Sequence, residues 1–369
     1  MIIVASVVLR RKINYNLMQT DSKLTALLGI KHPIIQGPFG GGLSTLNLTS
    51  TVSNLGGLGS FGAHNLEPEA IIALAMNLRT RTEGSFAINL WVSDWDLEMD
   101  RVDENVFLDR VKKYEATYQK VGAEVPRYKG NMKPNYERQV ECVLRAKPKV
   151  FSFVFGIPTR DILNECRRQN IITLGTATTV REALALEEAG VDAVLVTGAE
   201  AGGHRPWFLE NSEKDLMGIF TLVPMIRDSV KIPVVAGGGI VDRRGVRAAM
   251  ALGADAVQVG TAFLATEESG ASNLHKRRIL ENTDGSTRLS KAFTGRWVRF
   301  LPNAFLEEID RDSQNILPFP AQSWVTGPIK RTATLDGDYE ALYASQASSL
   351  VKGRSAKDVY AELKKGLFI

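Results

Sequence analysis

Eight short apolar segments recur along the chain, and stretches with a helical pattern lie between them. Helical patterns occupy 68–80, 159–170, 179–190 and 242–253, and several end in Gly or Asn, as helix C-caps do. Apolar strands that alternate with helices form a parallel sheet covered on both faces. Eight such units in roughly 250 residues predict a (β/α)8 TIM barrel, with an open doubly wound sheet as the competing architecture. The predicted strands are PIIQG (33–37), GLGSF (57–61), FAINLW (86–91), VFSFVF (150–155), IITLG (171–175), DAVLVT (192–197), PVVAGG (233–238) and DAVQVG (255–260).

Two regions fall outside this repeat. Residues 92–149 are charged and helical in character, and they interrupt the unit of the third strand. Residues 262–369 begin with the expected eighth helix and continue as a mixed tail. We therefore predict a single domain over 18–369, with 92–149 as a peripheral helical insertion after strand three and 262–369 as a C-terminal extension.

The first residues differ from the rest of the chain. MIIVASVVLRR places its basic residues after an apolar run, the reverse of a signal peptide, and the run is shorter than the ~20 apolar residues of a membrane span. A second methionine, Met18, directly precedes the globular part. We expect residues 1–17 to be an upstream extension that takes no part in the fold.

Composition and charge argue against several classes of function. A formal net charge of +4 without a long Lys/Arg run gives no basis for nucleic-acid binding, and no segment is long enough to cross a membrane. Cys142 and Cys166 form neither a redox pair nor a metal-ligand pair in sequence, which fits a reducing cytoplasm. We expect no metal site. The sequence leaves the oligomeric state open, and a homo-oligomer is compatible with it.

Glycine dominates the segments that follow the predicted strands. In such barrels the chemistry takes place at the C-terminal ends of the strands, so these segments are informative. QGPFGGG (36–42) follows the first strand and would let a flat ligand approach the backbone. After the seventh and eighth strands, Gly238 and Gly239, and then Gly260 and Thr261, offer backbone N–H groups where barrels often bind phosphate. Tight turns between strand and helix would explain the same glycines.

Another glycine pattern, GLGSFG at 57–62, matches G-x-G-x-x-G. The dinucleotide fingerprint also requires an acidic residue ~20 positions later. In this chain that region is TRTEG (80–84), ahead of the third strand. These glycines are better explained by close passage of the second strand beside a ligand or beside the first strand.

One of the four histidines, His204, follows two glycines on the loop after the sixth strand. A neutral imidazole there could accept a proton, and a charged one could hold an anion. An ordinary surface histidine is the alternative. Glu200 is close enough in sequence to tune it or to cap a turn. His64 faces the same mouth but lies at a helix start, whereas His32 precedes the first strand and His275 lies in a charged helix.

Together these motifs resemble the nitronate monooxygenases, formerly called 2-nitropropane dioxygenases. The resemblance runs from about Ile34 to Ala262 and continues more weakly through FTGR (293–296) and LYASQ (342–346), where members often have A-G-Q. Each motif alone is weak, but the ordered set is specific. The set comprises Q-G-P with glycines, F-x-x-N-L, S-F-x-F-G-x-P, T-A-T-T, E-A-G-G-H, A-G-G and Q-x-G-T.

The resemblance implies a barrel that binds FMN without covalent attachment and oxidises alkyl nitronates with O2 to a carbonyl compound and nitrite. Its catalytic residue would be His204, which removes the α-proton of a neutral nitroalkane or, when protonated, positions the nitronate anion. The expected partners are a small-molecule substrate and O2. The cofactor-binding residues that the resemblance implies are Gly37, Pro38, Phe39, Asn89, Thr197, Gly202, Gly203, Gly238, Gly239, Gln258, Gly260 and Thr261.

Three positions depart from the family pattern. Phe39 stands where many members have methionine, which replaces a flexible side chain with a rigid ring beside the cofactor. Thr197 stands where members often have glutamine, and Pro206 where they have glycine, ahead of a longer loop. These departures bear on the substrate more than on FMN.

Three other functions fit parts of the pattern. An FMN- and NAD(P)H-dependent enoyl-ACP reductase shares the E-x-G-G-H loop and the phosphate glycines, and it is the main alternative. A sugar-phosphate isomerase or epimerase would use the phosphate loops but usually needs more acid and base side chains at the strand ends. A non-catalytic flavin carrier would leave His204 without a role.

Overall fold

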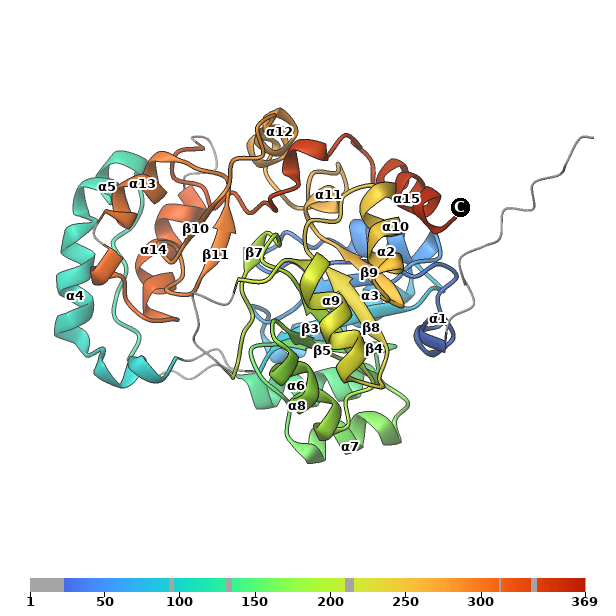
Figure 1. Cartoon of the computed structure of the whole chain (residues 1–369). Helices are drawn as coiled ribbons and strands as arrows, with labels where there is room; N and C mark the ends of the chain where they lie inside the picture. Colours follow the sequence, from blue (N-terminus) through green and yellow to red (C-terminus); the bar gives the residue numbers. More distant parts are fainter. Residues whose placement is uncertain are drawn as a thin grey trace, which may run out of the picture.

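The computed structural model describes residues 23–92, 96–130, 135–209, 216–311, 313–332 and 337–368. The predicted upstream extension, residues 1–17, lies outside this part of the chain. The described residues form two lobes, a barrel and a smaller lobe beside it (Figure 1). In these residues no helix combines the length and the apolar character that a membrane span requires.

Eight parallel strands form the barrel, which confirms the predicted fold. Their order around the sheet is β1-β9-β8-β6-β5-β4-β3-β2. The first and last strands of this order are joined at Leu58, which donates to Ile34 O at 3.0 Å and accepts from Gln36 N at 2.9 Å. The strands are β1 (Ile34–Gln36), β2 (Gly59–Gly62), β3 (Phe86–Trp91), β4 (Val150–Val154), β5 (Ile172–Ala177), β6 (Ala193–Thr197), β8 (Val234–Gly237) and β9 (Ala256–Val259).

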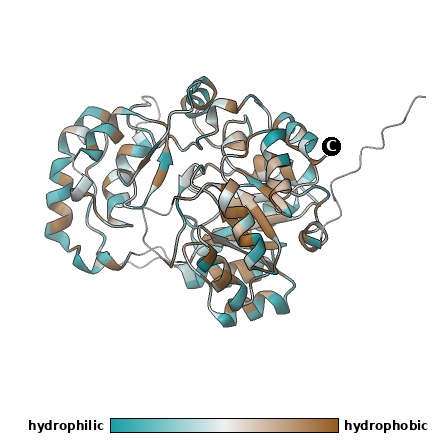
Figure 2. Cartoon of the chain, in the orientation of Figure 1, coloured by the Kyte–Doolittle hydropathy of each residue, from teal (hydrophilic) through white to brown (hydrophobic). Residues whose placement is uncertain are grey.

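The barrel strands are largely apolar along their length (Figure 2), and most of their residues are buried, as the unbroken apolar runs predict. Inside the barrel, Ile35, Val150 and Val235 pack together, and α1 (Lys23–Leu28) closes one end with the fully buried Leu24. The outer face is covered by helices, several of which begin at a threonine or aspartate that caps backbone N–H groups. These helices are α2 (Leu46–Asn54), α3 (Pro68–Arg79), α6 (Tyr136–Ala146), α7 (Arg160–Arg168), α8 (Val180–Ala189), α9 (Ile219–Ser229) and α10 (Arg243–Ala251).

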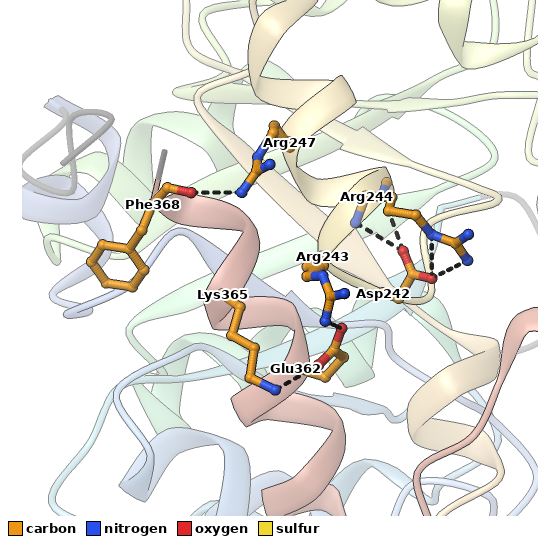
Figure 3. Close-up of polar contacts among 8 residues, drawn as sticks. Asp242, Arg243, Arg244, Arg247, Glu362, Lys365 and Phe368 are labelled. Atoms are coloured by element: carbon orange, nitrogen blue, oxygen red, sulfur yellow. Dashed lines mark hydrogen bonds and ion pairs between the residues drawn. The ribbon is translucent and has the colours of Figure 1, made fainter. Parts of the chain in front are cut away.

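The last covering position is filled from the far end of the chain. The helix expected directly after the eighth strand is a single turn, α11 (Thr261–Leu264), followed by α12 (Asn273–Glu281). Instead α15 (Ala356–Lys364) packs between α10 and α2, with Leu363 fully buried. Arg243 pairs with Glu362 at 2.9 Å at the edge of this contact (Figure 3). That pair is largely exposed, so burial of the apolar face of α15 contributes more to this packing.

The second lobe combines the insertion with the C-terminal tail. A second apolar core holds Phe107 and Tyr118 from the insertion and Phe293, Phe300 and Phe305 from the tail. Only the first part of 92–149 joins this lobe, because α6 returns to the barrel beside α3. The elements of the lobe are η1 (Leu97–Arg101), α4 (Glu104–Lys113), α5 (Glu115–Val121), β10 (Arg288–Ser290), β11 (Val298–Phe300), α13 (Ala304–Asp310), η2 (Ser313–Asn315) and α14 (Ala321–Thr332). The short helices η4 (Ser348–Leu350) and η5 (Lys365–Leu367) follow in the tail.

A three-stranded antiparallel sheet connects the two lobes. Its order is β10-β11-β7, and β7 (Gly203–His204) comes from the loop after β6. His204 lies opposite Val298, and Arg205 N donates to Trp297 O at 2.9 Å. The barrel mouth and the second lobe therefore meet at His204 (Figure 1).

Candidate active site

His204 is held on a strand rather than on a free loop. The preceding Gly203, the first residue of β7, has a φ of +81°, a left-handed conformation that favours glycine. The pairing of β7 with β11 then fixes the backbone of His204. Its Nε2 lies 3.2 Å from Oγ1 of Thr294, a buried residue of the tail. The imidazole is therefore oriented by a segment ninety positions further along the chain.

Aromatic side chains surround His204. The Trp91 ring lies edge-on to it with centroids 4.8 Å apart, and the Phe155 ring lies at 6.0 Å. The ring of Tyr343, from the tail, lies at 6.5 Å. Trp91 in turn stacks on His64, so both histidines share one aromatic cluster. Such a cluster gives the imidazole surroundings of low polarity.

Phe155 occupies its place at a backbone cost. It follows β4 with a φ of +61°, which is uncommon for a bulky residue and costs about 1–3 kcal/mol. The side chain is buried against Trp91, with ring centroids 4.7 Å apart. The surrounding aromatic packing holds Phe155 in this conformation. Strain of this kind often occurs at ligand sites.

A buried cation lies beside the two histidines. The Arg296 guanidinium is 4.2 Å from the ring centroid of Phe155 and 4.4 Å from that of Phe319. It also pairs with Asp96 at 2.8 Å, and its side chain is 7% exposed. This arrangement fixes a guanidinium, with its carboxylate partner, against the aromatic cluster. Arg296 ends the FTGR motif but was not among the predicted site residues.

The surroundings of both histidines lower their pKa values and so favour the neutral imidazole. Burial, together with the positive charge of Arg296, lowers the pKa of His204 well below its ordinary value, and His64 and Lys330 add to this effect. The same two main causes lower the pKa of His64 to about 3. These effects favour the neutral form of His204, which is the form that can accept a proton.

The glycine-rich loop after β1, residues 37–42, lies against the ends of β9 and β2. Gly37 N donates to Val259 O at 2.8 Å, and a side chain on Gly37 would approach Gly260 Cα at 3.4 Å. A Cβ on Gly62 would lie 2.5 Å from the Phe39 backbone. These contacts explain the glycines around 57–62 as sites of close backbone packing, as the sequence analysis expected. They place Gly37, Pro38 and Phe39 beside the C-terminal end of the eighth strand.

The predicted phosphate residues come together. Gly238 and Gly239 have φ values of +104° and +69°, and a Cβ on either would contact the segment at Glu200 and Ala201. Across this loop, Thr261 Oγ1 accepts from Ser345 N at 2.9 Å. The loops after β6, β8 and β9 thus meet the tail at one place.

Two observations fit a phosphorylated flat cofactor at this place. A Cβ built on Gly203 would have no atom within 4 Å, and a Cβ built on Gly260 would have only a Phe39 ring atom, at 3.8 Å. The space in front of these two glycines is therefore not filled by the described residues. The Ser345 hydroxyl is buried and has no hydrogen-bond partner in the described chain. Buried hydroxyls are normally satisfied, so this one indicates a missing ligand atom. Ser345 stands where family members often have glycine.

The remaining predicted cofactor residues line the same end of the barrel. Asn89 is buried and donates to Ser152 Oγ at 3.1 Å, which ties β3 to β4. Thr197 lies beside Gly237, and Gln258 lies on the other side of Gly237 in the sheet. Gly202 packs on the tail, because a Cβ there would lie 2.5 Å from the Ala344 carbonyl carbon.

Two neighbours of His204 in sequence have other tasks. The Glu200 carboxylate accepts from Ile219 N at 2.9 Å at the start of α9, which fits the turn-capping alternative rather than tuning of His204. Arg205 is buried, and this burial lowers the pKa of its guanidinium, whereas Glu182 and Glu200 act to raise it. In the described part of the chain, no cluster of His, Cys, Asp or Glu could hold a metal ion.

The fold and this site define a barrel enzyme with a histidine inside an aromatic cluster at its mouth. A model of the nitronate monooxygenase family matches residues 21–366, and the chain belongs to this family. A probable nitronate monooxygenase of Staphylococcus haemolyticus is 37% identical over 327 residues, covering 88% of this chain and 90% of that protein. One from Bacillus subtilis is 34% identical over 336 residues, covering 90% and 94%.

Solved structures agree with this assignment. The nitroalkane oxidase of Streptomyces ansochromogenes superposes with a TM-score of 0.85 at 34% identity, covering 94% of this chain and 98% of that one. FabK from Thermotoga maritima has a TM-score of 0.72 at 26% identity, covering 94% and 96%. Each of these superpositions covers 94% of this chain and therefore includes the second lobe as well as the barrel.

Proposed function

We propose that this enzyme uses non-covalently bound FMN and O2 to oxidise alkyl nitronates to a carbonyl compound and nitrite, and that it forms the nitronate from a neutral nitroalkane at His204. The observation that carries the second part is the place of His204 within an aromatic cluster, where burial lowers its pKa and favours the neutral imidazole. A neutral imidazole can take an acidic α-proton, whereas it offers no charge to a nitronate that is already formed.

The residues that would hold FMN follow from the glycine-lined surface. The backbone of Gly37, Pro38 and Phe39 would face the ring system, together with Gly202 and Gly203, and Asn89, Thr197 and Gln258 lie at the same end of the barrel. The backbone amides of Gly238, Gly239, Gly260 and Thr261 would hold the phosphate. When bound, FMN supplies the redox chemistry, since it accepts electrons from carbon and passes them to O2.

The protein's own residues would bind and orient the nitro compound. The apolar rings of Trp91 and Phe155 exclude water from the alkyl part. The positive charge of Arg296 favours the negative charge that develops on the nitro group as the proton leaves. His204 receives that proton. Arg296 keeps His204 neutral before the transfer and stabilises the anion after it.

The first test is an anaerobic absorbance titration of the protein as isolated. We would add the nitronate of 2-nitropropane to one sample and NADH to another. Loss of the oxidised flavin spectrum with nitronate, and nitrite on aeration, would support the proposal. Bleaching by NADH alone would instead favour the enoyl-ACP reductase alternative. A protein without a flavin spectrum after incubation with FMN would overturn the cofactor assignment.

We also place the enzyme in the cytoplasm. Cys142 and Cys166 are both buried free thiols, which is typical of proteins kept in a reducing compartment. Fractionation of cells that produce the protein would test this placement.

A further inference from the structure

The hydroxyl of Thr294 lies at the centre of three polar contacts. Its Oγ1 is 3.2 Å from His204 Nε2, 3.2 Å from Arg296 N and 3.2 Å from Arg296 O. Thr294 is buried and lies in the turn between β10 and β11. Arg296 N can only donate and Arg296 O can only accept, so two of these contacts have a fixed direction.

The one proton of this hydroxyl decides the state of His204. If the hydroxyl donates to Arg296 O, then Nε2 of His204 must be the donor to Oγ1, and all three contacts are hydrogen bonds. If the hydroxyl donates to Nε2, the contact between Oγ1 and Arg296 O has no proton between two oxygens. The first arrangement has one hydrogen bond more, which is worth about a tenfold preference.

The other nitrogen of His204 is then the proton acceptor. Nδ1 has no hydrogen bond to a described residue. Its lone pair is therefore not engaged by the part of the chain that the structure describes.

We propose that Thr294 is a positioning residue that holds His204 in the Nε2–H tautomer, so that Nδ1 accepts the α-proton of a neutral nitroalkane. This inference rests on the proposed function. The C–H bond of the substrate breaks, its proton forms the Nδ1–H bond, and the electron pair stays on the substrate as the nitronate. In the resulting imidazolium, the bond from Nε2–H to Oγ1 becomes charge-assisted and therefore stronger.

Thr294 thereby opposes the burial and the neighbouring groups that lower the pKa of the imidazole. Arg296, His64 and Lys330 all face His204 and disfavour its charged form. The hydroxyl of Thr294 favours the charged form because it accepts from Nε2–H. Removing the hydroxyl should therefore move the pKa of His204 further down.

The test compares Thr294→Val, which has nearly the same shape without a hydroxyl, with Thr294→Ser, which keeps the hydroxyl. Nitrogen-15 NMR of histidine-labelled protein as isolated reports the tautomer, and His204→Asn assigns the His204 signals. We expect an Nε2–H imidazole in the wild type and in Thr294→Ser, and a mixture of tautomers in Thr294→Val. An Nδ1–H imidazole in the wild type overturns the inference even if no variant folds.

Kinetics provide the second readout. With neutral nitroethane, Thr294→Val should lower kcat/KM about tenfold, as expected for the loss of one hydrogen bond. The apparent pKa of the acid limb in its kcat/KM profile should be lower than in the wild type. Thr294→Ser should restore both kcat/KM and this apparent pKa. With preformed nitronate the change should be less than about twofold. Equal losses on both substrates overturn the positioning role, whereas absence of activity on both in the wild type overturns the proposed function and leaves the NMR result decisive for the tautomer.

Discussion

The rings of Trp91 and His64 lie almost parallel, with centroids 4.0 Å apart and an interplanar angle of 13°. The edge of the same Trp91 ring faces His204. Trp91 is the last residue of β3, so one barrel strand positions an aromatic wall between two histidines. This wall limits the space beside the imidazole of His204, and several measurable consequences depend on it.

The first concerns substrate size. Trp91→Phe removes part of the wall and should enlarge the pocket. We expect the ratio of kcat/KM for a long-chain nitronate to that for ethylnitronate to rise by roughly tenfold, since each methylene in a hydrophobic pocket is worth about 1–3 kcal/mol. Trp324→Phe, in the second core, is the matched control and should leave the ratio unchanged. An unchanged ratio in Trp91→Phe would show that this ring does not bound the substrate site.

The second concerns the base. His204→Asn should reduce kcat/KM for neutral nitroethane by about 10²–10⁴-fold, the usual contribution of a general base. Preformed nitronate needs no base, so its rate should fall far less. His32→Asn, near Tyr360 at the other end of the barrel, should change neither rate. Parallel losses with both substrates would assign His204 to binding rather than to proton transfer.

The third concerns the phosphate. Ser345→Ala removes the buried hydroxyl without a partner and should weaken FMN binding about tenfold, because a hydrogen bond to a charged group is worth about 1.5–3 kcal/mol. Riboflavin, which lacks the phosphate, should bind the variant and the wild type equally. Fluorescence titration of the deflavinated proteins measures both. Ser348→Ala is the control, since that hydroxyl already accepts from Asn282 Nδ2. Equal weakening of both flavins would place Ser345 away from the phosphate.

The fourth concerns stability at low pH. Burial lowers the pKa of His275 to about 4, and its Nε2 bonds to Tyr343 O at 2.9 Å. Below the ordinary histidine pKa of about 6.5, His275 binds a proton in the unfolded chain but stays unprotonated in the folded chain until the pH reaches its lowered pKa. His275 therefore lowers the free energy of unfolding by about 1.4 kcal/mol for each pH unit as pH falls from about 6.5 to about 4.

His275→Gln should remove this contribution, since its amide can still donate to Tyr343 O and does not titrate. Urea unfolding of the wild type and of the variant at about pH 7.5 and pH 5 gives the difference, which we expect to be ~2 kcal/mol smaller for the variant. Parallel pH dependence in the two proteins would contradict the burial of a neutral imidazole at this position.

Local patterns were sufficient to predict the barrel strands. Each strand is an apolar run bounded by glycine or polar residues, and each of the eight predictions overlaps an observed strand. The eighth covering helix was misplaced, because α15 packs in its position from almost a hundred residues downstream. A helical pattern does not reveal which gap a helix will fill.

The sequence by itself determined the strands, the glycine-rich loops and the place of His204 at the barrel mouth, because these depend on residues adjacent in the chain. Only the tertiary structure decided that Thr294, Arg296 and Tyr343 from the tail surround this histidine. It also decided that the pKa of His204 is lowered, since burial and the charge of Arg296 act through space. Such contacts leave no periodic signal, because they join segments whose separation along the chain is set by the packing of two lobes.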